Sequence, residues 1–124
     1  MKEEVISFET AKLAKEKGFN ENSKGYYNKE GEFIEAALPQ GSKFNVGDDN
    51  VFSAPTQSLL QKWLREELKL SVETVFNGSE SFYWIIREMY PLGKEFSSVW
   101  DERFGWSTYE EAMDAALLKA LNLI

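Results

Sequence analysis

Histidine and cysteine are both missing from this chain of 124 residues. Without histidine, the chain lacks the side chain whose ordinary pKa lies nearest neutral pH and which enzymes use most often to move protons. Without cysteine, it has no disulfide, no thiolate nucleophile and no metal site built on sulfur. The carboxylates, amines and hydroxyls that remain need strong tuning by their surroundings to act as catalysts at pH 7. We therefore expect a protein that is not an enzyme.

Long apolar runs and local positive charge are missing as well. No stretch reaches the run of about 18 apolar residues that a membrane span needs, and the opening MKEEVISFET lacks the apolar core of a secretory signal. The net charge is −7, and Lys12, Lys15 and Lys17 are interleaved with Glu9 and Glu16. Because an acidic surface repels phosphate groups, these features predict a cytoplasmic protein that binds neither membrane nor nucleic acid.

Apolar residues are nevertheless abundant, at 43% of the chain, and aromatic residues make up 15%. This content is enough for a packed core, and the length is typical of one domain, so we expect a single domain over residues 1–124. Three segments combine helical periodicity with end signals: residues 7–17, about 55–70, and 108–123.

Capping residues mark the ends of these helices. Ser7 is suited to the N-cap of the first helix and Gly18 to its end, and Pro55 is suited to the first turn of the second. Ser107 and Glu110 match a capping box before the third helix. One continuous apolar face is predicted for that helix, formed by Tyr109, Met113, Ala116, Leu117, Ala120, Leu121 and Ile124.

Two hairpins separate the helices. The first joins Tyr26 and Tyr27 to residues 32–34 through the turn 28–31, and the second joins residues 72–76 to residues 81–89 through Asn77 and Gly78. The strand 81–89 is apolar on both faces, which predicts a central position in its sheet. Residues 39–53 and 91–105 read as loops. The fold class is therefore α+β: a small antiparallel sheet of two hairpins with three helices in the order α-β-β-α-β-β-α, the helices packed mainly on one face.

Patterns that could carry chemistry are incomplete. The triplet 41–43 (Gly-Ser-Lys) lacks the rest of a phosphate-binding loop, and Asp48 and Asp49 lack the alternating oxygen ligands of a calcium loop. Glu66 and Glu67 are adjacent on a helix and point about 100° apart, so they do not face one substrate. Glu67 lies toward the apolar face of its helix and would gain acid or base character only if buried. We assign no catalytic residue, no cofactor-binding residue and no metal ligand, and we expect no cofactor.

Aromatic residues and an arginine gather just before the third helix. Trp100, Arg103, Phe104 and Trp106 lie close together, with Tyr109 following. Aromatic residues with arginine are enriched where proteins bind other proteins. The alternative is that these rings pack into the core beneath a long loop. Trp100, Arg103, Phe104 and Trp106 are therefore the candidate partner surface.

Three segments carry a resemblance to a known family: ISFETAKLAKEKGF (6–19), SAPTQSLLQKWLREE (53–67) and STYEEAMDAALLKALNLI (107–124). They resemble a family of small uncharacterised proteins from bacteriophages and mobile elements of gut Bacteroidetes. The three segments cover somewhat over a third of the chain. The resemblance implies a phage or prophage accessory protein in the bacterial cytoplasm, and it implies no activity, cofactor or site residue.

Three functional hypotheses follow. The first is a non-enzymatic module that binds another protein, with a second copy of the chain as one candidate partner. The second is an acidic inhibitor that imitates nucleic acid and blocks a DNA-binding enzyme, which would need acids in a regular stripe. The third is a small carboxylate-dependent hydrolase, which would need two acids converging in a cleft. The mixed charges and the missing imidazole favour the first.

Overall fold

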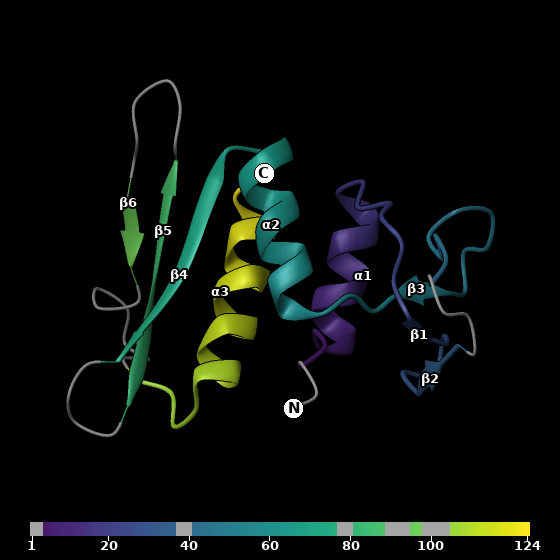
Figure 1. Cartoon of the computed structure of the whole chain (residues 1–124), viewed down its shortest axis with the longest axis horizontal. Helices are drawn as coiled ribbons and strands as arrows, with labels where there is room; N and C mark the ends of the chain where they lie inside the picture. The colour runs from purple at the N-terminus through teal and green to yellow at the C-terminus, as the bar shows by residue number, and fades with distance from the viewer. Residues whose placement is uncertain (1–3, 37–40, 77–80, 89–94, 98–104) are drawn as a thin grey trace. The chain divides into compact units, whose positions relative to one another are not determined.

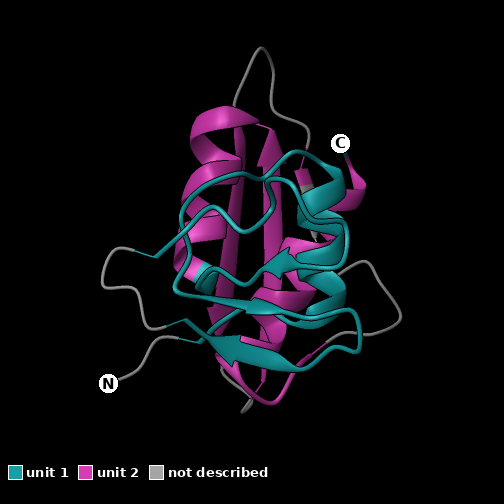
Figure 2. Cartoon of the chain, turned by 90° about the vertical axis from the view of Figure 1, so that its right-hand side faces the viewer, with its two compact units in different colours: residues 1–57, 124 teal, residues 58–123 magenta. Residues whose placement is uncertain are grey.

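The computed structural model describes residues 4–36, 41–76, 81–88, 95–97 and 105–124 (Figure 1). They divide between two compact units, which Figure 2 colours separately: unit 1 comprises residues 1–57 and 124, and unit 2 comprises residues 58–123. The single domain over residues 1–124 stays a prediction. The helices and strands follow the order α1 (Phe8–Glu16), β1 (Gly25–Tyr27), β2 (Phe33–Glu35), β3 (Phe52–Ser53), α2 (Gln57–Glu67), β4 (Leu70–Phe76), β5 (Phe82–Glu88), β6 (Glu95–Ser97) and α3 (Tyr109–Asn122).

The α+β class and both predicted hairpins are confirmed, and the structure adds two strands. Each hairpin gains a third strand, β3 or β6, within the segments 39–53 and 91–105 that the sequence predicts as loops. The prediction of one sheet built from both hairpins is wrong, because the hairpins belong to two separate antiparallel sheets of three strands each. Because β3 has two residues and β6 has three, neither is long enough to show an alternation of apolar and polar residues.

In unit 1, α1 begins and ends where its sequence predicts. The Ser7 hydroxyl oxygen accepts a hydrogen bond from the Thr10 amide at 3.3 Å, which makes Ser7 the N-cap. Gly18, at φ +98°, adopts the left-handed conformation that follows many helix ends. Thr10, Ala11 and Ala14 are fully buried. The buried face of α1 is therefore made of small side chains, and such a face allows close packing.

The first hairpin of unit 1 turns as predicted. The carboxamide oxygen of Asn28 accepts hydrogen bonds from the amides of Glu30 and Glu32, both at 3.0 Å. Gly31 has φ +85°, a conformation that costs a residue with a Cβ atom considerable strain. Asparagine and glycine thus hold the turn between β1 and β2 for different physical reasons.

Aromatic rings form the centre of the sheet in unit 1, whose strand order is β2-β1-β3. Tyr27 stands opposite Phe33 on one neighbouring strand and opposite Phe52 on the other, so these three rings project to one face. Phe8 of α1 joins them there, with its ring centroid 5.5 Å from that of Tyr27 and 5.7 Å from that of Phe52. The apolar face of the sheet is therefore closed by the first residue of α1.

Side-chain hydrogen bonds hold the loop that precedes β3. The Lys15 ammonium group donates to the backbone carbonyls of Asp48 and of Val51, the latter at 2.7 Å. The Asn45 carboxamide oxygen accepts from the amide of Ser53 at 2.8 Å. The predicted loop is thus held in place by Lys15 of α1 and by Asn45 of the loop itself.

In unit 2, α2 is shorter than predicted at both ends. It begins two residues after Pro55, and Leu70, the predicted last residue of the helix, is instead the first residue of β4. The chain turns at Lys69, whose φ of +58° lies in the left-handed region that residues with side chains seldom adopt. Leu60 and Leu64 on the predicted apolar face are fully buried.

The sheet of unit 2 has β5 at its centre, between β4 and β6, as its two apolar faces predict. Its register places Phe76 opposite Phe82 at the turn end of the hairpin. One face of this sheet holds the buried side chains of Val72, Trp84 and Ile86. α3 packs against both β4 and β5 and covers this face (Figure 1). The predicted packing of helices on one face is thus observed for this sheet.

The predicted N-cap of α3 is wrong by one residue. The cap is Thr108 and not Ser107, because the Thr108 hydroxyl oxygen accepts the Glu111 amide at 3.1 Å. Both pairs have the sequence pattern of a capping box, and only the backbone conformation distinguishes them. Tyr109 and Ile124, which the sequence places on the apolar face, are exposed. The residues of α3 that are buried are Ala112, Met113, Ala116, Leu117, Ala120 and Leu121.

Candidate interaction surface

The predicted partner surface lies partly outside the described residues. Trp100, Arg103 and Phe104 fall in the range 98–104, for which the structure gives no description. Trp106 and Tyr109, the other aromatic members of the predicted cluster, are described and belong to unit 2. These two residues locate a surface that also includes hairpin residues absent from the prediction.

Trp106 extends the end of the sheet in unit 2. It exchanges two backbone hydrogen bonds with Phe82, each with an N–O distance of 2.9 Å, and forms an isolated antiparallel bridge. Residues that stand opposite each other in such a bridge project to the same face of the sheet. The half-buried side chain of Trp106 therefore lies on the face that α3 covers, on the same side as Phe82.

Three rings form a row at this end of the sheet. The ring centroids of Phe76 and Phe82 are 5.4 Å apart, and those of Phe82 and Tyr109 are 6.1 Å apart with the planes at 89°. Phe76 is 56% exposed and Tyr109 43%. We call the side chains of Phe76, Phe82, Trp106 and Tyr109 the aromatic patch. Exposed apolar side chains that adjoin one another, unlike ones scattered singly, are typical of interaction sites.

The patch is exposed because the helix covering the sheet begins there. Tyr109 is the first residue of α3, and Phe76 and Phe82 are the residues that flank the hairpin turn. The buried core of the sheet continues along the same face at Trp84. The aromatic patch therefore lies where the buried core of unit 2 reaches the surface. Its side chains come from β4, β5, α3 and the residue bridged to Phe82, so regular secondary structure positions most of them.

The two stretches of sequence that contain the patch are acidic, although one of their acids, Glu73, projects to the opposite face of the sheet and pairs with Arg87. The stretches 70–86 and 105–118 contain five acidic residues and no lysine or arginine. Glu111 is the acid of α3 nearest the patch whose side-chain bonds are defined: its carboxylate accepts from the hydroxyls of Ser107 and Thr108 at 3.3 and 3.2 Å. The acidic residues are Glu73, Glu80, Glu110, Glu111 and Asp114.

Unit 1 exposes apolar side chains too, but they do not form one patch. Phe33 and Ile34 on β2 are 40% and 37% exposed. Because they are adjacent on a strand, they project to opposite faces of the sheet. Val46 is 61% exposed, on the loop before β3. Phe33 contacts Tyr27 on β1, with ring centroids 5.6 Å apart, so unit 1 has one exposed ring in its cluster, whereas the row in unit 2 has two, Phe76 and Tyr109, both in contact with Phe82.

Sequence reasoning missed Phe76 and Phe82, although a signal for both was present. Both residues continue the alternation that buries Val72 and Trp84, so they belong to the apolar face, and both flank the predicted turn at Asn77 and Gly78. Phe76 and Phe82 are the pair nearest the turn, and a helix that begins beside them does not extend over them. What the sequence did not reveal is that α3 begins beside this pair.

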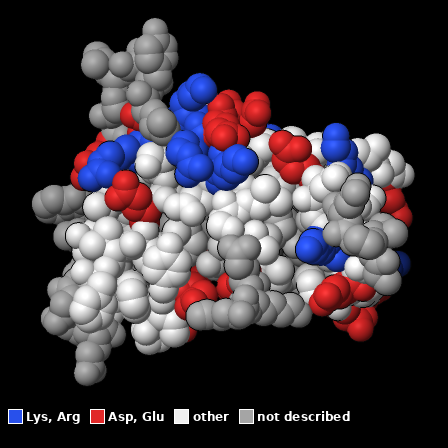
Figure 3. Space-filling model, viewed as in Figure 1, with Lys and Arg blue, Asp and Glu red and all other residues white. Residues whose placement is uncertain are grey.

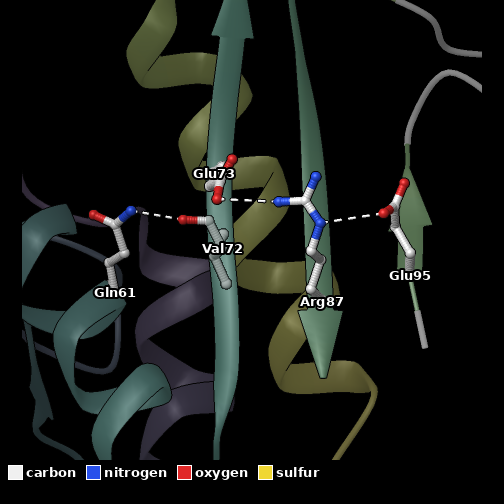
Figure 4. A network of polar contacts seen from close by, with 5 residues as sticks. All are labelled: Gln61, Val72, Glu73, Arg87 and Glu95. Atoms are coloured by element: carbon white, nitrogen blue, oxygen red, sulfur yellow. Dashed lines mark hydrogen bonds and ion pairs between the residues drawn. The ribbon is translucent and has the colours of Figure 1, made fainter. Parts of the chain in front are cut away.

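The opposite face of the unit 2 sheet carries a row of charges across three strands (Figure 4). The Arg87 guanidinium on β5 contacts the Glu73 carboxylate on β4 at 3.2 Å and the Glu95 carboxylate on β6 at 3.1 Å. The hydrogen bond from Arg87 to Glu95 and the charge of Glu73 raise the pKa of Arg87 further above its ordinary value. All three side chains are about half exposed. The row joins the strands and offers no reactive group.

The remaining sequence candidates carry no chemistry in the structure. Glu67 is exposed, and so are Asp48 and Asp49. Ser42, in the triplet 41–43, forms a backbone bridge with Ser23. Over the described residues, no group of three or more acids is placed to hold a metal ion. Within the same ranges, no helix combines the length and the apolar character needed to cross a membrane.

Comparisons with known proteins find no family model, no curated protein and no solved structure that matches the chain. The resemblance to a phage family therefore stays a prediction.

Proposed function

We propose that the chain is a non-enzymatic module that binds another protein through the aromatic patch of unit 2. The observation that carries this proposal is the row of rings from Phe76 to Phe82 to Tyr109, which ends in side chains 56% and 43% exposed. Rings held by ring contacts lose little conformational entropy on binding, because they are already fixed in place. A partner gains the burial of apolar surface that water contacts in the free protein.

The residues named at the sequence level adjoin this surface along the chain. Trp106 is part of the patch, and the stretch 98–104 ends directly before Gly105 and Trp106. The proposal extends to a phage or prophage accessory role in the bacterial cytoplasm, where the partner is a host or phage protein. The accessory role and the host or phage origin of the partner both depend on the sequence resemblance.

A photo-crosslinking experiment tests the surface directly. p-Benzoylphenylalanine is placed at position 76 in one variant and at position 46 in another, and the two are irradiated in bacterial cells. Val46 is the matched control because it is an exposed apolar residue of unit 1, outside the patch. We expect a discrete adduct at position 76 and none at position 46. Equal adducts at both positions, or none at either, would contradict the proposal.

The acidic nucleic-acid mimic is less favoured by the distribution of charge. On the face seen in Figure 3, Lys and Arg side chains lie next to Asp and Glu side chains, whereas a mimic needs acids in an unbroken stripe. On the sheet of unit 2, Arg87 interrupts the acids Glu73 and Glu95. A carboxylate-dependent hydrolase is less favoured because the candidate Glu67 is exposed.

A further inference from the structure

The ring row of the aromatic patch ends at a strand edge that has no neighbouring strand among the described residues. β4 is an outermost strand of its sheet, and Phe76 is its last residue. Phe82 stands opposite Phe76 and exchanges two backbone hydrogen bonds with Trp106 on its other side. The backbone N–H and C=O of Phe82 therefore point away from β4, and those of Phe76 point away from β5.

The same alternation sets the direction of the other backbone groups along β4. Successive residues point their N–H and C=O groups to opposite edges, so Thr74 and Val72 share the outward direction of Phe76. The Gln61 side chain agrees with this direction, since it reaches the Val72 carbonyl from the side of β4 opposite to β5 (Figure 4). Over the described residues, no hydrogen bond occupies the outward groups of Thr74 and Phe76. This part of the edge thus offers two N–H donors and two C=O acceptors.

Resting on the proposed function, we propose that the partner adds an extended segment to the edge of β4, with its backbone bonded to Thr74 and Phe76 and an apolar side chain opposite Phe76. The segment runs antiparallel to β4, because parallel pairing is less stable per residue. Opposite residues of paired strands project to the same face, so this side chain lies against the Phe76 ring. It extends the line of Trp106, Phe82 and Phe76 across the sheet by one strand. In this mode of recognition main-chain bonds give affinity, and alternate side chains give specificity.

The outward backbone groups distinguish this occupant from others. A helix satisfies its backbone groups internally, so it would gain nothing from those of Thr74 and Phe76. A second copy of β4 could place its Val72 opposite Phe76, but the carbonyl needed for that pairing already accepts the Gln61 side chain. Shifted by one pair, the second copy would place the hydroxyl of Thr74 against the ring. An apolar segment of another protein meets both requirements.

Two short synthetic peptides of identical sequence, in which phenylalanine alternates with threonine, test the proposal on the full chain. In the first, the threonine residues are N-methylated, which blocks the edge that faces away from β4. In the second, the phenylalanine residues are N-methylated, which removes the N–H donors that would bond to Thr74 and Phe76. We expect the first peptide to bind about tenfold more tightly than the second in NMR titrations, because only the first can complete these bonds.

Amide hydrogen exchange locates the pairing within the chain. In the free protein, the amides of Thr74 and Phe76 should exchange rapidly, whereas those of Glu73 and Val75, which pair with β5, should exchange slowly. At about ten times its Kd, the first peptide should slow exchange at Thr74 and Phe76 about tenfold. The amides of Glu73 and Val75 are the internal control and should be unchanged.

Two substitutions at one position separate the backbone from the side chain. Thr74→Pro removes an outward N–H, and proline is tolerated on an edge strand where its nitrogen faces away from the sheet. Thr74→Val keeps this donor. We expect Thr74→Pro to weaken binding of the first peptide severalfold and Thr74→Val to leave it unchanged. Circular dichroism checks the fold of both, and if Thr74→Pro is unfolded, the two peptides on the wild-type chain decide the question.

Several outcomes would overturn the inference, and they separate it from the proposed function. Equal affinity of the two peptides, with loss in Phe76→Ser, refutes strand addition and leaves the interaction surface intact. Binding that slows exchange at neither Thr74 nor Phe76 refutes the edge as the site. Slow exchange there in the free chain also refutes the inference, and if it grows with protein concentration the occupant is a second copy. If neither peptide binds, the inference is wrong, and the crosslinking experiment decides the proposed function by itself.

Discussion

Phe82 and Tyr109 meet edge to face, with ring centroids 6.1 Å apart and planes at 89°, although one lies on the central strand of a sheet and the other on the first turn of a helix. This arrangement is one of the preferred geometries of aromatic pairs. The contact joins the start of α3 to the hairpin at the point where the core of unit 2 becomes exposed. Phe82 therefore supports the fold of unit 2 and also belongs to the surface that we propose binds a partner.

Substitutions within the aromatic patch should separate these two roles. Phe82→Ala removes a half-buried ring that contacts both Phe76 and Tyr109, and it should reduce the free energy of unfolding by about 2 kcal/mol. Phe76→Ser removes a ring at the exposed end of the row and should cost less than about 1 kcal/mol. Urea denaturation of both variants measures the difference. A larger loss of stability in Phe76→Ser than in Phe82→Ala would contradict the placement of Phe82 between Phe76 and Tyr109.

The buried face of α3 should not tolerate a charge. Leu117 is fully buried in the middle of the helix, so Leu117→Asp should destabilise the fold by more than about 4 kcal/mol. Lys119→Asp places the same carboxylate at an exposed position of the same helix and should change stability by about 1 kcal/mol or less. Thermal unfolding followed by circular dichroism measures both. A folded, cooperative Leu117→Asp variant would refute the placement of this face.

Two neighbouring hydroxyl groups should differ in their effect on α3. Thr108→Ala removes the N-cap, whose oxygen accepts the Glu111 amide, and should cost about 1 kcal/mol. Ser107→Ala removes an exposed contact to the Glu111 carboxylate and should cost less than about 0.5 kcal/mol. Denaturation curves measured in parallel provide the test. If the two costs were reversed, the capping box predicted from Ser107 and Glu110 would be the correct one.

Substituting Gly41 and Gly47 by alanine should show how much stability a clashing Cβ atom costs, because the two glycines differ mainly in the space around that atom. Both have positive φ, +72° and +87°, so alanine is strained at either position by about 1 kcal/mol. At Gly47 nothing lies within 4 Å of the added atom, whereas at Gly41 it would lie 2.5 Å from the backbone oxygen of Ser23. Gly41→Ala should therefore be clearly more destabilising than Gly47→Ala in urea denaturation. Similar costs would contradict the bridge between Ser23 and Ser42.

Salt, and not pH, should control the contribution of Arg87. A cation whose pKa is raised on folding contributes stability below its ordinary pKa and loses it only as the pH rises through the raised value. The stability difference between wild type and Arg87→Gln should therefore be unchanged from pH 6 to pH 9. It should shrink in 1 M salt, because Glu73, Arg87 and Glu95 are exposed to ions. Arg65→Gln, which removes a charge from α2, is the control.

The predicted features that are confirmed depend on local signals. Ser7 and Gly18 define α1 because capping involves residues within one turn of the helix. Asn28 and Gly31 define the first turn because a side-chain hydrogen bond and a positive φ act within four residues. The central position of β5 could be inferred because its apolar residues occur on both faces, and this property is visible along one strand.

The features that were missed depend on contacts between distant residues. β3 exists because Phe52 and Ser53 pair with Tyr27 and Tyr26, and two residues carry no pattern of their own. α2 ends early, at Glu67, because the chain turns at Lys69 and Leu70 pairs in β4, which overrides helical propensity. Predicting the aromatic patch likewise requires the position of α3 relative to the hairpin β4–β5, which no local pattern contains.

The bond from the Gln61 side chain to the Val72 carbonyl, at 2.6 Å, has a consequence for how molecules of this protein meet (Figure 4). β4 is an outermost strand of its sheet, and its outward carbonyls are the groups to which an incoming strand would attach. Gln61 occupies one of them from within the same molecule. A strand of another molecule would have to displace this bond to pair edge to edge with β4 at Val72.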